Sequence, residues 1–552
     1  MSRRSAADKY DARRREFLEK EQRLLYADNQ GVFETVLATA KRYGTAMASL
    51  EYQRIFLHLS SWPETRCERA FFPQKDEFHW RKRFERPFVT HDSGKPLGKS
   101  DMILFHISHE RDYEDMLRMM QMSGIALRSE DRAGTWPIVI AAGLCVTANP
   151  LPLAPFVDAF IIGETEPALG PVLDTIKSLG AQGAGMSKIL RWVAQLPGIY
   201  VPSHHGVTDV GTTIMRQWAG ADAIGSRSCV CTPKCDLGPI SLLEIARGCP
   251  YNCRFCMAGY IYLPYRENRL EDLMESIDEL PKNMPLCLMG CSPPSHSAFG
   301  DIVGYAEKNR HKVTLGWLRP EDELQLRNMC EDYSPCTVTV APEAGTESLR
   351  KVVGKSLSDE EVIDAFRKAP PDAERGRLYF MLGLPFEEEE DRQGIVELVE
   401  RVREMTDLPL VVSISPFVPR PWTAFQWSPM VRPRRLRERL EPIEAGLKRI
   451  SKVELEVSSF REGHIVALLA RGGADVARAL EERLKGLGWN TAFGNAGIKI
   501  NWVFKPLKPG KKFGWDFLNM GFGYTRLTRE LQLAVSANQC RFKAKPRPEE
   551  EE

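Results

Sequence analysis

Three cysteines stand within eight residues near the middle of the chain, and they constrain its fold more than any other feature. Cys249, Cys253 and Cys256 follow the mostly apolar run 240–245, so they form a short loop directly after a predicted strand. Such a loop can wrap its thiolates around one metal centre. A structural zinc site uses four protein ligands and closes its shell, whereas three cysteines on a four-iron cluster leave one iron open. The pattern therefore predicts a metal centre with an open position at the end of a strand.

The spacing Cys-x3-Cys-x2-Cys, with Phe255 directly before the last cysteine, resembles the signature of the radical SAM superfamily. A zinc knuckle or three buried thiols is the alternative, which the lack of a fourth Cys or His at zinc spacing downstream disfavours. The resemblance implies that Cys249, Cys253 and Cys256 bind a [4Fe-4S] cluster. It also implies that the open iron binds the amino and carboxylate groups of S-adenosylmethionine (SAM), with Phe255 near the adenine.

The composition is typical of a cytoplasmic enzyme. A chain of 552 residues with 43% apolar content should form about three domains with real cores. The 75 Lys and Arg nearly cancel the 74 Asp and Glu, so no broad basic field indicates nucleic-acid binding. No apolar run approaches a membrane span of about 20 residues, and the first residues lead into a charged helix rather than a signal sequence. The thirteen cysteines are therefore expected to be reduced thiols.

Strand-like runs alternate with helical patterns between residues 239 and 430. This alternation predicts a parallel sheet covered by helices, and an α/β fold class. The resemblance implies a partial (β/α)6 barrel of the TIM type, whose first strand leads into the cluster loop and whose later strand ends hold the cofactor. The six predicted strands are residues 241–246, 286–290, 312–317, 337–341, 377–383 and 410–415.

Motifs at several strand ends resemble one subgroup, the radical SAM proteins with a cobalamin-binding domain. By this resemblance Glu343 binds the SAM ribose hydroxyls, with a surface ion pair as the alternative. Gly383 lets the backbone approach the adenine, because a glycine has no side chain to obstruct it. The acidic run 387–391 is expected to begin a helix rather than to bind a metal. The motifs are residues 256–266, 341–347, 378–385 and 415–427.

The second strand end departs from the superfamily pattern. The usual Gly-Gly-Glu is absent, and residues 289–295 read Met-Gly-Cys-Ser-Pro-Pro-Ser. Ser292 and polar backbone groups are then expected to contact the methionine amino group, unless Cys291 has an unusual role. Arg319 is the candidate for the SAM carboxylate, since arginine pairs bidentately with carboxylates; an ion pair at the barrel rim is the alternative.

The first 200 residues predict a doubly wound sheet of Rossmann-like type. Strand-like runs fall at residues 32–38, 100–107, 136–142 and 158–162, separated by helical stretches such as 113–125. Small residues in the turns 43–49, 143–150 and 163–166 leave room for a large flat ligand at the strand ends. The residues alone identify no ligand.

The subgroup resemblance implies that this ligand is cobalamin, contacted by Gly143, Asn149, Gly163 and Glu164. No Asp-x-His-x-x-Gly sequence marks a lower cobalt ligand, so a base-off form is expected. The histidines at 106, 109, 204 and 205 are interpreted as ordinary polar residues. A domain that has lost corrinoid binding is the alternative.

Two further features lie outside the barrel. Cys229, Cys231 and Cys235 either are reduced linker thiols, the favoured interpretation, or ligate a second centre with Cys540. Beyond residue 430 a helix at 434–450, strands at 452–457 and 464–469, a helix at 473–487 and a strand at 498–504 predict a small α/β appendage. The predicted organisation is a helical extension (1–30), the Rossmann-like domain (31–200), a linker (201–238), the barrel (239–430), the appendage (431–540) and a disordered tail (541–552).

Together these features predict a cobalamin-dependent radical SAM enzyme, most simply a methyltransferase acting on a carbon centre. One alternative is a radical SAM enzyme that rearranges, cyclises or oxidises its substrate; another is a noncatalytic or RNA-associated iron-sulfur protein. The expected partners are a small-molecule or peptide substrate and an electron donor such as flavodoxin or ferredoxin. The sequence marks no catalytic residue beyond the cofactor contacts.

Overall fold

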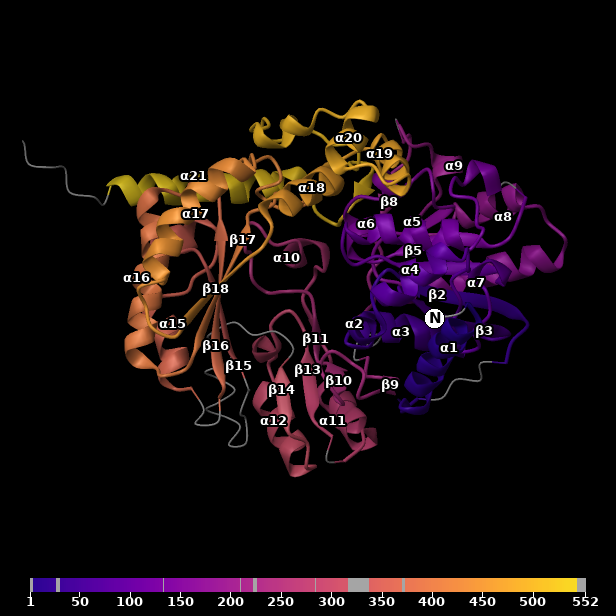
Figure 1. Ribbon diagram of the computed structural model, residues 1–552, viewed down its shortest axis with the longest axis horizontal. Helices are drawn as coiled ribbons and strands as arrows, with labels where there is room; N and C mark the ends of the chain where they lie inside the picture. The colour runs from indigo at the N-terminus through magenta and orange to yellow at the C-terminus, as the bar shows by residue number, and fades with distance from the viewer. Residues whose placement is uncertain are drawn as a thin grey trace, which may run out of the picture.

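The computed structural model describes residues 3–25, 30–132, 134–208, 210–221, 226–282, 284–315, 337–369 and 373–543. The N-terminal sheet and the strands of the barrel-type region lie side by side, each with its own helices. The C-terminal helices run across the top of both in the view of Figure 1. The predicted α/β class is confirmed. None of the described helices is long and apolar enough to cross a membrane.

The N-terminal domain is a six-stranded sheet in the order β3-β2-β4-β5-β6-β7, in which β7 is antiparallel to β6 and the other neighbours are parallel. The chain places β3 on one side of β2 and β4 on the other, so the carboxyl ends of β2 and β4 form a topological switch point, where ligands bind in such sheets. The strands are β2 (Phe33–Thr39), β3 (Thr65–Phe71), β4 (Met102–His106), β5 (Ile138–Ala142), β6 (Ala159–Ile161) and β7 (Ile199–Tyr200).

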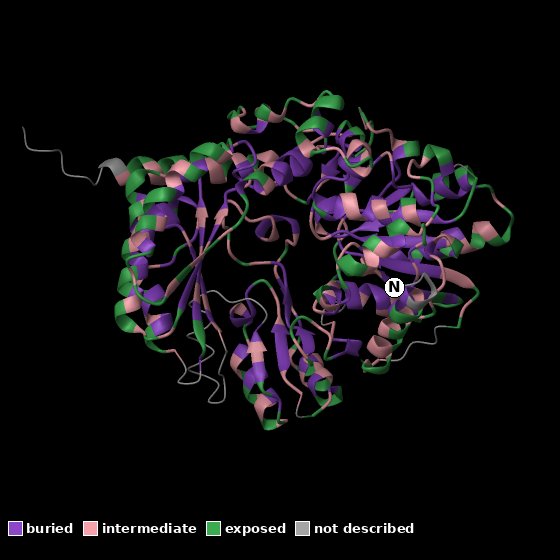
Figure 2. Ribbon diagram, viewed as in Figure 1, coloured by how far each residue is buried: buried purple, intermediate pink, exposed green. Residues whose placement is uncertain are grey.

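Alternating residues of these strands face two different cores, as the period of a strand requires. Leu37 and Leu104 pack with α3 (Leu50–Ser61), α7 (Glu166–Ala181) and α8 (Met186–Val193). Val36 and Ile103 pack on the opposite face with α5 (Asp112–Met122). The predicted doubly wound domain is therefore present, and Figure 2 shows its strands buried between the helices.

The barrel-type region contains seven parallel strands among the described residues. They form two sheets, β10-β13-β14 and β15-β16-β17-β18, and residues 316–336 between them lie outside the described ranges. Six of them match the predicted strands. Their bounds are β10 (Ser241–Glu244), β13 (Leu286–Met289), β14 (Val313–Leu315), β15 (Thr337–Glu343), β16 (Arg375–Leu382), β17 (Leu410–Pro416) and β18 (Val453–Val457).

Helices follow these strands and bury one side against them. In Figure 1, α15, α16 and α17 stand outside β15–β18, and α11 and α12 stand beside β10, β13 and β14. The helices are α11 (Leu270–Glu279), α12 (Phe299–Lys308), α14 (Glu347–Val352), α15 (Asp359–Arg367), α16 (Glu389–Met405) and α17 (Pro433–Leu447).

The C-terminal appendage differs from its prediction in three places. The strand at 452–457 exists as β18, but it pairs in parallel with β17 and so belongs to the barrel sheet. The predicted strand 464–469 is wrong, because these residues lie in α18 (Phe460–Arg471). A short continuous apolar run fits a buried helix as well as a buried strand. The predicted strand 498–504 is also wrong, since Ile500–Phe504 form a short 3-10 helix.

The chain ends with α19 (Val476–Leu484), α20 (Trp489–Asn495) and α21 (Tyr524–Lys543). α21 packs against α14 and crosses the carboxyl ends of β15–β18 (Figure 1). The first residues of the predicted disordered tail, 541–543, are the last residues of this helix. Residues 544–552 lie outside the described ranges.

Candidate active site

The cysteine loop begins where β10 ends. A two-residue ladder between β11 (Ala246–Arg247) and β12 (Arg266–Glu267) closes the base of the loop. Gly248 has φ +89°, and a Cβ there would lie 2.7 Å from the carbonyl oxygen of Tyr262. Only glycine fits this close, left-handed turn. Local geometry therefore directs the chain straight from the strand into the loop.

Cys249, Cys253 and Cys256 are all partly exposed, so a bound group can reach them. Burial raises the pKa of Cys256, and the nearby thiol of Cys249 and carboxylate of Glu343 raise it further. No three His, Cys, Asp or Glu side chains in the described ranges surround a single ion position. Sulfurs at the corners of a four-iron cube stand further apart than the ligands of one ion. Three partly exposed thiols on one loop can ligate three irons of such a cluster and leave the fourth iron open.

The loop is held against the second half of the barrel by Arg254. Its backbone N–H donates to Val353 O at 2.9 Å, and its Nη1 donates to Val352 O at 2.8 Å at the end of α14. Its Nε donates to Glu530 Oε2 at 3.2 Å, so α21 also holds the loop. Asn252 O lies 2.7 Å from where a Cβ on Gly354 would stand. The loop and the helices around it form one packed unit.

Phe255 projects to the strand ends of the second half-barrel. It packs with a buried cluster that includes Ala344, Leu384 and Phe417, the residues that follow β15, β16 and β17 closely. Its predicted position near an adenine remains a prediction, but it joins the cluster loop to the strand ends from which a cofactor is bound in such folds.

Glu343, the predicted ribose ligand, ends β15 in a strained conformation. Its φ is +69°, and the β15–β16 register shifts between Val340 and Glu343. Burial raises the pKa of Glu343, although Lys355 Nζ, 3.6 Å from Oε1, opposes this rise. A non-glycine residue in this region costs about 1–3 kcal/mol, and such strain concentrates at ligand sites. The strain and the nearby Cys256 favour Glu343 as a binding residue over a surface ion pair.

Gly383 starts a turn whose backbone is fixed by a buried carboxylate. Its φ is +86°, and a Cβ would lie 2.8 Å from Leu436 Cδ2 on α17. Glu387 Oε2 accepts from Gly383 N at 2.6 Å, and Arg439 Nη1 lies 3.0 Å from Glu387 Oε1. The glycine is therefore required by helix packing, and its approach to an adenine remains a prediction. The run 387–391 begins α16, as expected, with a capping box between Glu388 and Asp391.

Two of the predicted SAM contacts are less informative. Ser292 is buried and accepts from Ser295 Oγ at 3.0 Å, so its hydroxyl braces the turn after β13. Arg319 lies outside the described residues. Both remain predictions.

The residues predicted to contact cobalamin are committed to protein contacts. A Cβ on Gly143 would stand 2.6 Å from Ile107 O, and one on Gly163 would stand 2.1 Å from Gln217 O. Asn149 Nδ2 donates to Ala470 O at 3.0 Å and to Gly472 O at 2.8 Å. Glu164 pairs with two arginines of the barrel. Their role toward a corrinoid stays a prediction, and a ligand at the sheet edge needs contacts from further residues.

Glu164 belongs to a buried charge network between the N-terminal domain and the barrel. Arg247, two residues before the first cysteine, lies 2.7 Å from both Glu164 and Glu166. Arg266 Nη2 lies 2.6 Å from Glu164 Oε1, and Glu244 pairs with Arg247 at 2.7 Å. The base of the cluster loop is thus tied directly to the loop after β6.

The switch point of the N-terminal sheet also faces the cluster loop. His106, the last residue of β4, places Nε2 3.2 Å from Glu51 Oε2. Burial would raise the pKa of Glu51, but His106, Arg54 and Arg247 lower it to about 2. Tyr262, six residues after Cys256, is near Glu51 and Cys291, whose charges raise the pKa of its phenol together with burial. Sequence reasoning missed Glu51, because no local pattern marks it, and it placed Tyr262 in the motif 256–266 without assigning it a role.

The other cysteine cluster does not form a metal site among the described residues. Cys229 Sγ donates to Gln53 O at 3.4 Å and Cys231 Sγ donates to Ile240 O at 3.3 Å, so each thiol has its own backbone partner. Cys540 lies on α21, across the molecule from β9 (Val230–Cys231) in Figure 1. The favoured interpretation as reduced thiols fits these contacts.

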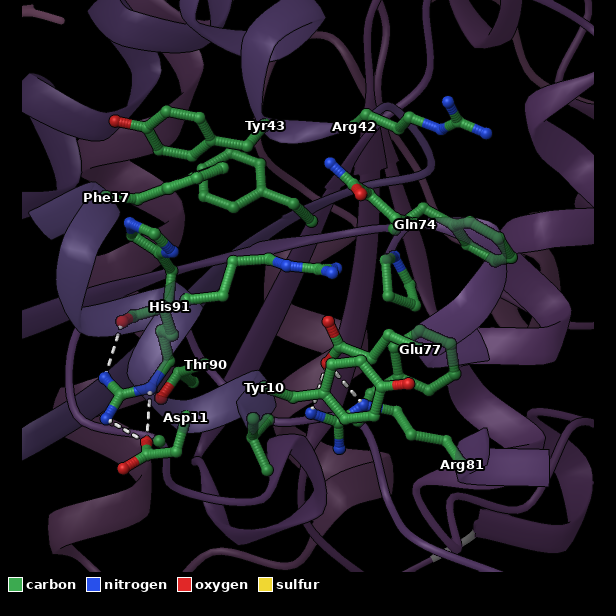
Figure 3. Close-up of a pocket in the computed structure, with 18 of the residues that line it drawn as sticks. Tyr10, Asp11, Phe17, Arg42, Tyr43, Gln74, Glu77, Arg81, Thr90 and His91 are labelled. Atoms are coloured by element: carbon green, nitrogen blue, oxygen red, sulfur yellow. Dashed lines mark hydrogen bonds and ion pairs between the residues drawn. The ribbon is translucent and has the colours of Figure 1, made fainter. Parts of the chain in front are cut away.

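A cavity of about 800 Å³ lies away from the cluster loop, between α1 (Arg3–Glu19), α4 (Lys75–Arg83) and the ends of β2 and β3. Figure 3 shows aromatic rings of Tyr10, Phe17 and Tyr43 on its walls, together with Arg81, which pairs with Glu77. None of its lining residues belongs to the cysteine loop. We therefore assign the chemistry to the loop rather than to this cavity.

Two sequence models of known families match the chain. Residues 52–202 match the N-terminal domain of radical SAM proteins, and residues 243–399 match the radical SAM superfamily. Together the two matches cover more than half of the chain.

The chain is also similar to individual proteins. It is 28% identical to an uncharacterized protein, MJ0966, of Methanocaldococcus jannaschii, over 69% of this chain and 80% of that protein. It is 24% identical to the tRNA-2-methylthio-N(6)-dimethylallyladenosine synthase of a Ruegeria species, over 39% of this chain and 52% of that enzyme. The second similarity therefore spans about half of its relative.

Among solved structures, the radical SAM methyltransferase TsrM from Kitasatospora setae aligns with a TM-score of 0.44 and 11% identity, over 69% of this chain and 72% of that one. The cobalamin-dependent SAM radical enzyme OxsB aligns with a TM-score of 0.46 and 14% identity, over 68% of this chain and 53% of that one. Both scores lie below 0.5, so any finer function must be argued from the residues of this chain.

Proposed function

Because the chain belongs to the radical SAM superfamily, we propose that it is a cobalamin-dependent methyltransferase that modifies a carbon centre. The observation that supports cobalamin as a second cofactor is the position of the N-terminal sheet. The carboxyl ends of its strands, where doubly wound sheets bind ligands, face the cysteine loop. α6 (Leu144–Ala148), which follows β5, contacts α10 (Ala258–Ile261), which follows the last cysteine.

In this proposal the cluster supplies the electron that splits SAM, and cobalamin supplies the carrier for the methyl group. The chain's own residues bind and orient the reactants. Cys249, Cys253 and Cys256 hold three irons, and Glu343 accepts hydrogen bonds from the ribose hydroxyls. Phe255 excludes water beside the adenine, where a drier site strengthens the remaining electrostatic contacts.

The switch point is the proposed place for the corrinoid. Glu51 and His106 line this edge, and Tyr262 joins them from the barrel side. A flat ligand at this edge would lie between the N-terminal sheet and the cluster loop. The buried pairs from Arg247 to Glu164 and Glu166 fix the spacing of the two halves.

The test is anaerobic reconstitution of the whole chain with iron, sulfide and hydroxocobalamin, followed by SAM and a reductant. We expect a corrinoid absorption spectrum that stays with the protein on gel filtration. We also expect two products from SAM, 5′-deoxyadenosine and S-adenosylhomocysteine. The variant Cys253→Ala should give neither product, while the control Cys540→Ala, which removes an exposed thiol of α21, should give both.

The product pattern separates the candidate functions. Deoxyadenosine without S-adenosylhomocysteine or bound corrinoid supports a rearrangement, cyclisation or oxidation and refutes the methyl transfer. Neither product, from a protein that contains four irons, refutes the enzymatic function under these conditions. An electron donor of the flavodoxin or ferredoxin class and a small-molecule or peptide substrate complete the proposal.

A further inference from the structure

A fourth cysteine lies at the cluster loop. Cys291 follows β13, and β13 pairs in parallel with β10, the strand that runs into the loop (Figure 1). Ile245 N donates to Met289 O at 3.0 Å, so the pairing continues to the last residue of β13. A Cβ on Gly290 would lie 3.1 Å from Ala246 O. The two backbones therefore leave the sheet together, one toward Cys249 and the other toward Cys291.

The turn after β13 touches the cysteine loop itself. Ser295 Oγ lies 3.4 Å from Tyr251 Oη, and Tyr251 lies between Cys249 and Cys253. The thiols of Cys249 and Cys256 are close enough to act electrostatically on the thiol of Cys291. Tyr262 borders the same space, since Cys291 acts on its phenol. The parallel pairing of β10 with β13 and the contact between Ser295 and Tyr251 thus place the turn that carries Cys291 against the cysteine loop.

Cys291 is an exposed residue, unlike Cys287, the preceding cysteine, which lies within β13. Cys287 is 2% exposed and packs in a small core with Leu50 and Leu242. Cys291 is exposed to solvent. An accessible thiol among cluster cysteines can bind iron, whereas a buried thiol in an apolar core serves packing.

We propose that Cys291 ligates the fourth iron of the cluster while SAM is absent and gives up this position when SAM binds. The inference rests on the proposed four-iron cluster at Cys249, Cys253 and Cys256. The thiol releases its proton to solvent as the Fe–S bond forms, because a bound metal stabilises the thiolate. When SAM arrives, its amino and carboxylate groups replace the thiolate, which takes up a proton. No electron is transferred in this exchange.

The exchange would protect the cluster between turnovers. A cluster with an open iron exposes that iron to water and oxidants, whereas a fourth thiolate closes the shell. SAM must then compete with an internal ligand. Its apparent dissociation constant is the intrinsic constant divided by the fraction of molecules in the open form.

The experiment compares the wild-type chain, Cys291→Ala and the control Cys540→Ala, each reconstituted anaerobically with 57Fe. Mössbauer spectra of the oxidised cluster without SAM should show four irons with sulfur ligands in the wild type and in the control. Cys291→Ala should keep four irons per chain but show one iron with a nitrogen or oxygen ligand. SAM should convert the wild-type spectrum into one with a single distinct iron. It should also bind Cys291→Ala tighter, by about threefold or more.

Two results would overturn the inference. A distinct iron in the wild type without SAM, identical to that in Cys291→Ala, would show that Cys291 does not reach the cluster. Equal SAM affinities of the wild type and the variant would show that no internal ligand competes. A wild-type chain that assembles no four-iron cluster would instead refute the proposed function, so the two failures are distinguishable. Circular dichroism checks that Cys291→Ala folds.

Discussion

At the scale of single residues, Glu343 carries the most information about the site. The sequence placed it at the fourth strand end of the barrel by resemblance, and β15 does end there. Its left-handed backbone and its neighbour Cys256 come only from the tertiary structure. A carboxylate held in a strained conformation beside the cluster loop is expected to serve ligand binding rather than stability.

We expect Glu343→Gln to weaken SAM binding about 10- to 100-fold. The substitution keeps the size of the side chain but removes the charge, and a hydrogen bond to a charged group contributes about 1.5–3 kcal/mol. Equilibrium binding of SAM to the reconstituted protein measures the loss. Glu374→Gln is the control, because Glu374 is exposed beside the opposite, amino end of the sheet. An unchanged dissociation constant in Glu343→Gln would remove this residue from the SAM site.

Residue-scale reasoning failed where burial depends on distant partners. β3 was not predicted, because its sequence Thr-Arg-Cys-Glu-Arg-Ala-Phe is highly charged. Its Arg69 is fully buried, with Nη2 2.8 Å from Glu21 and 2.6 Å from Asp92. Burial would raise the pKa of Glu21, but Arg69 and His91 hold it at about 2. No local pattern shows that two carboxylates from other segments will neutralise this arginine.

At the scale of elements, the cysteine loop depends on the helices that hold it. Gly354 follows α14 with φ +77°, and a Cβ there would lie only 2.7 Å from Asn252 O, which is too close. Gly497 has nearly the same φ, +75°, but a Cβ there would have no atom within 4 Å. The two glycines share the conformational requirement, but only the first touches the loop.

We expect Gly354→Ala to destabilise the protein more than Gly497→Ala and to lower the iron bound after reconstitution. Both variants place alanine in the left-handed region, at a cost of about 1–2 kcal/mol. Only Gly354→Ala also pushes Asn252 and the loop away from α14. Denaturant unfolding and iron analysis measure the two effects. Equal iron contents in the two variants would show that the loop binds its cluster without this contact.

The strands and helices were predicted best where the periodic pattern was long. The six barrel strands and the charged helix at 434–450, observed as α17, were predicted from alternation and amphipathicity. The run 464–469 was misassigned because all its residues after His464 are buried, which removes the periodicity that separates helix from strand. Ser459, which caps α18 by accepting from Glu462 N, was the available signal for a helix start.

At the scale of the whole molecule, the buried charges between the domains hold the two cofactor regions together. Glu164 is 3% exposed and pairs with Arg247, which is 6% exposed. A second ion pair, Arg111 with Glu462, also joins the N-terminal domain to the C-terminal part, but its side chains are 56% and 38% exposed. Both ion pairs join the N-terminal domain to the rest of the chain, but only the pair of Glu164 with Arg247 is buried.

We expect Glu164→Ala to reduce the free energy of unfolding by about 3–5 kcal/mol, because Arg247 and Arg266 would stay buried with one partner fewer. Glu462→Ala should cost less than about 1 kcal/mol, as exposed pairs do. Urea unfolding at pH 7 measures both. Similar losses in the two variants would contradict the structural role of the buried network.

The pH dependence of this difference follows from the pKa of Glu164. Burial would raise it, but Arg266, Arg247 and the amide of Ala219 lower it below the ordinary 4.5. A carboxyl with a lowered folded-state pKa stabilises the protein above its unfolded-state pKa and loses this effect as the pH falls through the folded-state value. The gap between wild type and Glu164→Ala should therefore be full at pH 7 and shrink below about pH 4.

The amino-acid sequence alone was enough to locate the cysteine loop, its place after a strand, the alternation of strands and helices, and the glycine turns. These features depend on neighbours in the chain, so local patterns report them. Only the folded chain shows that β18 joins the barrel, that Glu164 serves the domain contact, and that the turn carrying Cys291 lies beside the cysteine loop. Each of these depends on segments far apart in the sequence, because the stability of a buried charge and the reach of a thiol are set by partners that only folding brings together.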